Sequence, residues 1–304
     1  MKSDSFRIKG VDRASGRANR SARMTLRLDA FLAKTLSLKY TGHGFIAAGS
    51  RMSGSLASHH ALVTGGGRGI GRAIAAGLSR AGATVTVLGR NRAPLDDAVA
   101  SGDAQAAVVA DVVDRAQVHA AIAEAAARQP IDILIANAGA AESAPFVKSD
   151  AALFQRMLDV NLMGVVHAAQ AVLPAMKARG HGRIVAIAST AGLKGYAYVS
   201  AYSAAKHAVI GLVRSMALEI AGSGIAVNAV CPGFTETDLL EASIGNIVAK
   251  TGRSREQAVA ELSKHNPQGK LVTPAEVADC VLWLCGAGAG AITGQAIAVA
   301  GGEI

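Results

Sequence analysis

The chain has 304 residues, of which 51% are hydrophobic and 17% charged, enough to fill a sizeable core and to exclude disorder throughout. Its formal net charge is +9, but residues 1–58 hold eleven Lys and Arg against three Asp, which leaves 20 basic and 19 acidic residues in the remainder. Because this main body is nearly neutral, it encodes no basic groove for nucleic acid, and we expect no nucleic-acid partner.

Residues 1–51 are rich in Arg and Ser, poor in acidic residues and without a continuous apolar run, so they do not resemble a secretory signal peptide. Three interpretations stay open: a transit-like segment, a basic tail for anionic surfaces, or translation from an upstream start. We favour the last, with Met52 beginning the functional chain nine residues ahead of the first obvious strand segment. We expect residues 1–51 to be a disordered, dispensable extension and residues 52–304 to form the functional domain.

From residue 60 onward, apolar strand patterns alternate with helix patterns. The segment "ALVTGGGRGIGRAIAAGLSRAGATVTVLGR" predicts a buried strand, a glycine turn, an amphipathic helix and a second buried strand, which together make a βαβ unit. The predicted elements that follow are a strand in "AQAAVVADV", a helix over 114–128, a strand in "IDILIANAG", a long helix over 150–178, a strand in "GRIVAIAS", a helix containing "AYSAAK", a strand in "IAVNAVCPG", an excursion to 272, a helix from Pro274 to Cys285 and a closing strand.

Continuous apolar strands are typical of a parallel sheet that helices cover on both faces. Seven of them predict an α/β fold, a single Rossmann-type doubly wound domain with a seven-stranded parallel sheet. Residues 280–302 are uncharged and long enough to suggest a membrane helix, but "GAGAGAITGQ" in their middle predicts a helix end, a loop and a final buried strand. We therefore expect no membrane partner.

Three cysteines, Cys231, Cys280 and Cys285, follow no metal-ligand spacing and form no recognisable disulfide framework. We therefore expect no metal site, and a reducing compartment, the cytoplasm, fits best.

The glycine turn Thr64–Gly71 lies between a predicted strand and a predicted helix. In that context backbone amides and a helix N-terminus cradle a pyrophosphate, and the glycines let the backbone approach it closely. Farther along, Tyr202 and Lys206 stand four residues apart on one face of a predicted helix. A tyrosine has a pKa of about 10, and a neighbouring ammonium lowers that pKa towards the range of a useful proton carrier.

The glycine turn has the spacing T-G-x-x-x-G-x-G, and further signatures follow it in order: "NAG" at 137–139, "VNLMG" at 160–164 with Asn161, Ser189 at the fifth strand, Tyr202 thirteen residues later with Lys206, and "CPG" at 231–233. With this ordered set, residues 58–304 resemble the classical short-chain dehydrogenase/reductase family. The resemblance implies an NAD(P)-dependent oxidoreductase that moves hydride between a nicotinamide cofactor and a secondary alcohol or ketone.

The resemblance also implies residue roles. Tyr202 would be the general acid/base, Lys206 would tune it and bind the nicotinamide ribose, Ser189 would hydrogen-bond the substrate oxygen, and Asn161 would hold a water that links Lys206 to solvent. The expected cofactor-binding residues are Gly65, Gly67, Arg68, Gly69, Ile70, Gly71, Arg90, Asp111, Val112, Asn137, Ala138, Gly139, Tyr202, Lys206, Pro232, Gly233, Thr235 and Thr237.

Cofactor choice depends on the end of the second strand. A carboxylate there favours NAD, whereas an arginine accommodates the 2′-phosphate of NADP. Here Gly89 stands at the position that is acidic in the family pattern, Arg90 follows it, and Arg68 is a second cation. We therefore expect NADP as the preferred cofactor, with NAD as the alternative.

The substrate is expected under a lid at about 234–270, a helical pair that mixes apolar residues with five cations. This mixture favours an acyl-CoA or acyl-carrier thioester. The local sequence is also similar to that of family members acting on 3-hydroxyacyl or 3-oxoacyl thioesters. The alternatives are another ketone or alcohol, or a non-catalytic dinucleotide-binding sensor. The resemblance further implies a homotetramer assembled through the helices near 150–178 and 200–221.

Overall fold

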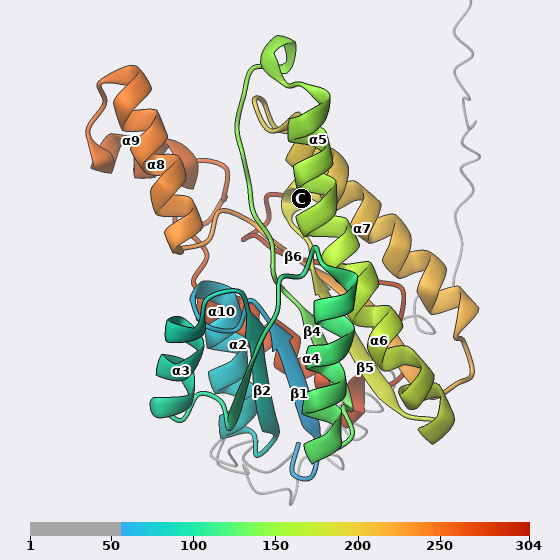
Figure 1. The fold of residues 1–304 in the computed structure, drawn as a ribbon. Helices are drawn as coiled ribbons and strands as arrows, with labels where there is room; N and C mark the ends of the chain where they lie inside the picture. The colour runs from blue at the N-terminus through green and yellow to red at the C-terminus, as the bar shows by residue number, and fades with distance from the viewer. Residues whose placement is uncertain (1–55) are drawn as a thin grey trace, which may run out of the picture. The chain divides into compact units, whose positions relative to one another are not determined.

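The computed structural model describes residues 56–304, so the predictions for residues 1–51 lie outside the described residues. A seven-stranded parallel sheet forms the centre of this part of the chain (Figure 1), as the apolar strand patterns predict. Its strands are β1 (His60–Thr64), β2 (Thr84–Gly89), β3 (Ala106–Val109), β4 (Ile133–Ala136), β5 (Gly182–Ile187), β6 (Ile225–Pro232) and β7 (Ala296–Val299). The order across the sheet is β3-β2-β1-β4-β5-β6-β7, and every neighbouring pair is parallel.

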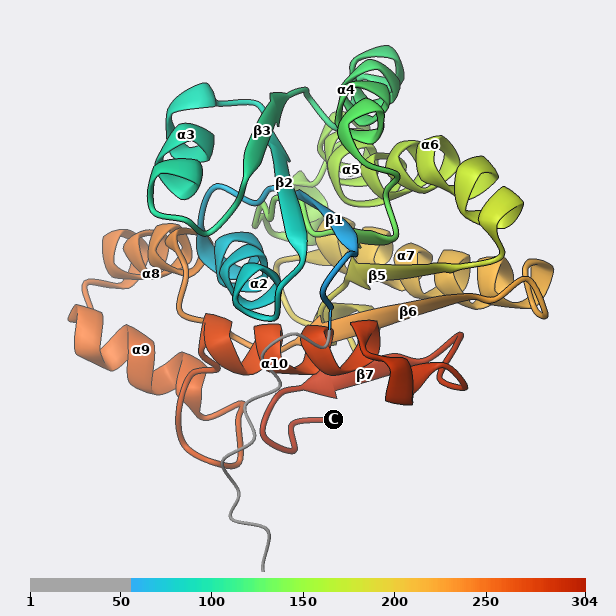
Figure 2. The same ribbon diagram turned by 90° about the horizontal axis from the view of Figure 1, so that it is seen from below.

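Helices cover both faces of the sheet, as Figure 2 shows. One face packs against α4 (Arg115–Arg128), α6 (Gly164–Arg179) and α7 (Ser200–Glu219). The other packs against α2 (Gly69–Arg80), α3 (Arg92–Ala100) and α10 (Pro274–Cys285). In β1 the side chain of Leu62 enters the first core, and those of Ala61 and Val63 enter the second. A strand buried on both faces needs apolar residues at most of its positions, which explains the nearly continuous apolar runs.

The chain runs outward from β1 to β3 and then returns to β4 on the other side of β1. In open α/β sheets, ligands bind outside the carboxyl ends of the strands at such a switch point. The fold therefore directs attention to the loops that follow β1 and β4.

The predicted helix over 150–178 is interrupted. Helix α5 (Ala151–Leu158) passes into one π-helical turn, η2 (Asp159–Met163), before α6 begins. By length and composition alone, the stretch Ala151–Arg179 is apolar enough to cross a membrane, but 44% of its most apolar 18-residue window is buried inside the protein. The expected absence of a membrane partner stays a prediction.

The C-terminal part confirms the predicted order of helix, loop and strand. Helix α10 ends at Cys285, a short 3-10 turn, η4 (Ala287–Ala289), follows, and β7 closes the sheet. The prediction that this last strand is buried is wrong, because β7 lies at the sheet edge, where its residues are half-buried or exposed. Helix α3, between β2 and β3, is an element that the sequence patterns above do not specify.

The segment 234–270 contains two helices, α8 (Asp238–Thr251) and α9 (Arg255–Ser263), which stand apart from the sheet in Figure 1. Leu240 and Ile244 of α8 pack against Ala258 and Leu262 of α9, so the pair has a small core of its own.

Candidate active site

The glycine turn between β1 and α2 packs more tightly than any side chain would allow. Gly65 has a left-handed backbone with φ +65°, and its amide donates to the carbonyl oxygen of Leu88 at 2.7 Å. A Cβ on Gly71 would lie 2.2 Å from the carbonyl oxygen of Gly65 and 2.4 Å from Nδ2 of Asn137. Both positions therefore require glycine.

The N-terminus of α2 has the properties of an anion site. Its N-cap residue, Arg68, makes no side-chain capping bond, and its first turn holds no acidic residue. The first amides of a helix need an acceptor and carry the positive end of the helix dipole. The cradle of Gly65, Gly67, Gly69 and Gly71, with Ile70 packed on the core beneath it, thus fits the pyrophosphate of a dinucleotide.

Thr64 and Asn137 join this turn to the end of β4. The hydroxyl oxygen of Thr64 accepts hydrogen bonds from the amides of Asn137 and Ala138, each at 3.0 Å. The side chain of Asn137 donates to the carbonyl oxygens of Thr64 and Gly65 at 3.0 and 3.3 Å. Thr64 is therefore a positioning residue, although in the sequence it is visible only as the first residue of the glycine motif.

Asn161 lies in the π-helical turn and is completely buried. Its Nδ2 donates to the carbonyl oxygens of Ala140 and Met157 at 2.9 and 3.0 Å, and its Oδ1 accepts from the amide of Ala140 at 3.3 Å. π-Helical turns occur frequently at functional sites. Both amide protons of Asn161 are donated to protein, so its expected contact with a water stays a prediction.

Lys206 lies beside Tyr202 on α7, and its side chain is buried. Its Nζ donates to the carbonyl oxygen of Ile187 at 2.9 Å and lies 5.6 Å from the centre of the Tyr202 ring. A Cβ on Gly139 would lie 2.8 Å from Oδ1 of Asn161 and 3.6 Å from this Nζ, so the loop after β4 borders both side chains. The structure therefore brings Asn161, Tyr202 and Lys206 to one loop.

Ser189 completes the group predicted from the sequence. It follows β5 and begins the 3-10 turn η3 (Thr190–Gly192), where its hydroxyl oxygen accepts from the amide of Ala191 at 3.1 Å. Gly192 of this turn packs directly on α7, since a Cβ there would lie 2.7 Å from the carbonyl oxygen of Lys206.

Burial is the largest cause of the pKa shifts of Lys206 and Tyr202. Burial lowers the pKa of Lys206 to about 8. Burial also raises the pKa of Tyr202, and hydrogen bonding with Ser189 opposes that rise. The sequence predicts that the ammonium lowers the pKa of the phenol, whereas without cofactor the cost of burying a phenolate is larger. The phenol of Tyr202 is therefore protonated at neutral pH.

Two arginines lie where the adenosine end of a dinucleotide is expected. Arg90 directly follows β2, and its guanidinium is 3.8 Å from the carboxylate of Asp111. Arg68 is 3.8 Å from Asp238. Both side chains are about 70% exposed, and ion pairs of this kind are weak. Val112, next to Asp111, is buried against Gly164.

The loop after β6 approaches the glycine turn from the other side. It begins at Gly233, directly after Pro232 ends β6, and the methyl group of Thr237 would lie 3.4 Å from a Cβ on Gly69. Thr237 caps α8 by accepting from the amide of Leu240. Thr235 is buried and its hydroxyl donates to the carbonyl oxygen of Gly233, so this side chain braces the loop.

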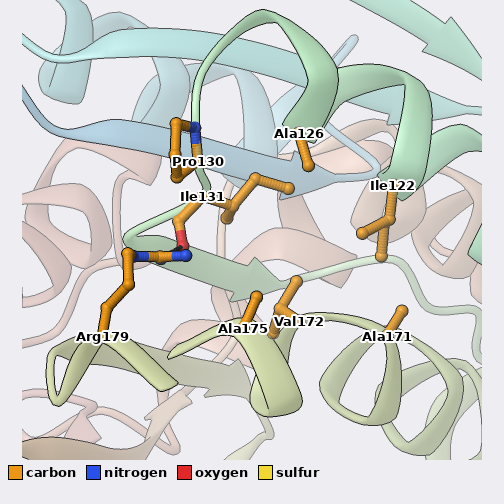
Figure 3. Close-up of a pocket in the computed structure, with 8 residues that line it drawn as sticks. All are labelled: Ile122, Ala126, Pro130, Ile131, Ala171, Val172, Ala175 and Arg179. Carbon is orange, nitrogen blue, oxygen red and sulfur yellow. Dashed lines mark hydrogen bonds between the residues drawn. The ribbon is translucent and has the colours of Figure 1, made fainter. Parts of the chain in front are cut away.

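A surface cavity of about 210 Å³ lies elsewhere, between α4, α6 and the start of β4 (Figure 3). Its lining includes Ile131, which precedes β4, and Arg179, at the end of α6. These residues lie at the amino-terminal ends of the strands, opposite to the loops described above. The cavity therefore contributes nothing to the candidate active site.

The comparisons with known proteins agree with this geometry. The sequence profile described as short chain dehydrogenase matches residues 59–246. The chain belongs to the short-chain dehydrogenase family. As a member of this family, it is an NAD(P)-dependent oxidoreductase that interconverts ketones and alcohols.

Relatives in the short-chain dehydrogenase family align with this chain over nearly their whole length. The D-beta-hydroxybutyrate dehydrogenase of Rhizobium meliloti strain 1021 is 36% identical over 80% of this chain and 97% of its own. The acetoacetyl-CoA reductase of the same organism is 35% identical over 81% of this chain and 98% of its own. The crystal structure of a variant actinorhodin polyketide ketoreductase with NADPH is 37% identical, has a TM-score of 0.78, and covers 81% of this chain and 97% of that one.

The charges of the segment 234–270 differ from what an anion-binding lid needs. The segment holds five Lys and Arg and also five Asp and Glu. Arg255 pairs with Glu241, Arg253 and Lys264 pair with Glu261, and Lys270 pairs with Glu276 of α10. Its apolar side chains largely fill the core between α8 and α9. Four of the five cations of this segment therefore already have a carboxylate partner, so its charge does not favour a phosphate-bearing carrier.

Proposed function

We propose that this protein uses NADP(H) to interconvert a secondary alcohol and a ketone, and that its substrate is a 3-hydroxyacyl or 3-oxoacyl thioester. The observation that carries the proposal is the position of Tyr202 beside the buried ammonium of Lys206, at the loops that follow β4 and β5. A hydride transfer to a ketone must be matched by a proton on the oxygen, and this pair supplies one.

Each residue has a distinct task in this proposal. Tyr202 donates its phenolic proton to the carbonyl oxygen during reduction and takes a proton back from the alcohol during oxidation. Ser189 donates a hydrogen bond to the same oxygen and thereby orients it. The Lys206 ammonium lies close enough to stabilise the phenolate that remains. The nicotinamide, when bound, supplies or accepts the hydride. Asn161 fixes the loop at Ala140 and so holds the wall next to Lys206.

The preference for NADP rests on the end of β2. Gly89 supplies no carboxylate to repel a 2′-phosphate, and Arg90 directly follows it with an exposed guanidinium. NADPH is also the dinucleotide in the ketoreductase structure that this chain resembles. NAD remains the alternative cofactor.

The substrate class rests on the relatives more than on the lid. Two of them are named for hydroxybutyrate and acetoacetyl-CoA, which carry their alcohol or ketone at the third carbon of a four-carbon chain, and the second of these compounds is a thioester. The third is a polyketide ketoreductase. We further propose a homotetramer in which α5, α6 and α7 meet their counterparts, since Leu218 of α7 is 81% exposed. The cytoplasm suits the three cysteines, which are free thiols.

The test is a steady-state assay of residues 52–304 with acetoacetyl-CoA, in which NADPH and NADH are compared at equal concentrations. We expect NADPH to be favoured at least tenfold and Arg90→Ala to weaken NADPH binding by about tenfold, as loss of a charged hydrogen bond predicts. Arg128→Ala, an exposed arginine at the far end of α4, is the matched control. A preference for NADH would refute the cofactor proposal.

The assay also separates an enzyme from a dinucleotide sensor. Tyr202→Phe should lower kcat by about 10²- to 10⁴-fold, the usual contribution of a general acid, while NADPH still binds. If wild type and Tyr202→Phe both bind NADPH and neither turns over any ketone tested, the sensor alternative would replace the enzymatic one.

A further inference from the structure

The penultimate residue, Glu303, has a buried carboxylate that the chemistry above does not use. Its side chain is only 2% exposed. The Tyr196 hydroxyl donates to its Oε1 at 2.5 Å, and Nζ of Lys194 lies 3.0 Å from the same oxygen. A buried charge is costly unless it is paired and hydrogen-bonded. The tail of the chain is thus fastened to the loop between η3 and α7.

This loop belongs to the active site. The Tyr196 hydroxyl also approaches the hydroxyl of Thr190 at 2.7 Å, and Thr190 directly follows Ser189. The Lys194 ammonium lies 5.1 Å above the Tyr196 ring. Burial and the Glu303 carboxylate both raise the pKa of Tyr196, so its hydroxyl stays a donor across the working pH range. A continuous set of contacts therefore runs from Glu303 to the turn that begins at Ser189.

The same tail holds the end of the segment 234–270. Gly301 has φ +62°, and a Cβ there would lie 1.9 Å from Oδ1 of Asn266. Asn266 is buried, and Nδ1 of the adjacent His265 lies 3.8 Å from Glu303. The rings of Tyr196, Phe234 and His265 lie in mutual contact, with centres 5.3 to 5.8 Å apart. The loop of Lys194 and Tyr196 and the end of the segment 234–270 therefore meet at one carboxylate.

We propose that Glu303 is a positioning residue that clasps the loop of Lys194 and Tyr196 to the end of the segment 234–270, and thereby holds the wall against which the substrate binds. The proposal rests on the proposed function for the location of the substrate. It assigns to Glu303 an effect on substrate affinity and none on the proton transfer at Tyr202.

The first test measures hydrogen exchange in the full chain without substrate. Glu303→Ala should speed amide exchange in residues 193–199 and 262–268 by about tenfold, because local opening loses a charged hydrogen bond, and Tyr196→Phe should do so in the same peptides. Exchange in β1, β4 and β5 should stay unchanged. The matched controls are Glu219→Ala, which removes an exposed carboxylate at the end of α7, and Tyr198→Phe, which alters an exposed phenol.

The second test measures turnover. Glu303→Ala should raise the KM for the ketone by about fivefold to tenfold with kcat nearly unchanged, and Glu303→Gln, which keeps an acceptor for Tyr196, should recover part of the affinity. Unchanged exchange in both peptides, or a uniform rise across the sheet strands in both Glu303→Ala and Tyr196→Phe, would overturn the clasp. Absence of turnover in the wild type would instead refute the proposed function, and the exchange result would still decide the clasp.

Discussion

The buried ammonium of Lys206 combines an unfavourable environment with a proposed role in proton transfer at Tyr202. Its Nζ donates to the carbonyl oxygen of Ile187, and no carboxylate of the described residues forms an ion pair with it. Burial therefore lowers its pKa, and the same charge that we propose to stabilise the Tyr202 phenolate weakens the folded state. Such a compromise is typical of residues whose environment is tuned for chemistry.

Lys206 should give the folded state a specific dependence on pH. Its folded pKa of about 8 lies below its ordinary value of 10.5, so the cost of burial is complete below pH 8. Between these values the unfolded state binds more protons, and stability rises with pH. Relative to Lys206→Met, the wild type should gain roughly 3 kcal/mol between pH 7.5 and 10.5, at about 1.4 kcal/mol per pKa unit.

Urea unfolding of both proteins without cofactor, at several pH values, measures this difference. Cys231, whose pKa burial raises to about 11, is present in both proteins and largely cancels. A stability difference that does not change between pH 7.5 and 10.5 would show that the pKa of Lys206 is not lowered in the folded state.

For single residues, the sequence is enough to select the candidates Asn161, Ser189, Tyr202 and Lys206, because their spacing along the chain can be read directly from it. The direction of the pKa shift at Tyr202 does not follow from spacing. It depends on how completely distant segments exclude water from the phenol, and only the folded structure shows this.

Among the elements, the turn from β1 to α2 and the π-helical turn between α5 and α6 differ in predictability. The glycine turn is visible in the sequence because its backbone geometry demands glycine. The π-helical turn is not visible, because nothing in the segment "DVNLMG" breaks a helix. The interruption is accompanied by the hydrogen bonds of Asn161 with Ala140, a contact between residues 21 positions apart.

Gly71→Ala should disable the glycine turn. The new methyl group would fall on the carbonyl oxygen of Gly65, so the turn must move and the anion cradle opens. We expect NADPH affinity to fall at least tenfold and stability to fall by about 1–3 kcal/mol, the usual cost of overpacking. Fluorescence titration and thermal unfolding measure the two effects.

Gly245→Ala is the control for this change. Gly245 lies inside α8, and a Cβ there meets no atom of the described residues within 4 Å. Alanine favours a helix more than glycine does, so this variant should be neutral or slightly more stable. Equal NADPH affinity in the Gly71→Ala variant and the wild type would contradict the assignment of the cradle.

For the molecule as a whole, residues 56–304 contain the sheet, both of its helical layers and every residue assigned to the candidate active site. The seven-stranded parallel sheet is predicted correctly because a strand buried on both faces leaves a continuous apolar run. The exposure of β7 is not predicted correctly, since the residues of a strand do not show whether another element covers the edge of the sheet at which it lies.

Deletion of residues 1–51 should leave catalysis intact. The curated relatives match 97–98% of their own length to this chain while leaving about a fifth of it unmatched. We expect NADPH affinity, kcat and KM to agree with those of the full chain within about twofold, the scatter of such measurements. A large loss of turnover on deletion, with unchanged thermal stability, would assign these residues a catalytic role.

The burial of Glu303 has a practical consequence for anyone who produces this protein. An affinity tag or fluorescent fusion appended after Ile304 would begin one residue from a carboxylate that holds Lys194 and Tyr196. We expect such an addition to disturb the last residues of the chain where Gly301 packs against Asn266. Purification handles belong at the amino-terminal end, and kinetic constants from carboxyl-terminally tagged material should be compared with those of protein from which the tag has been cleaved.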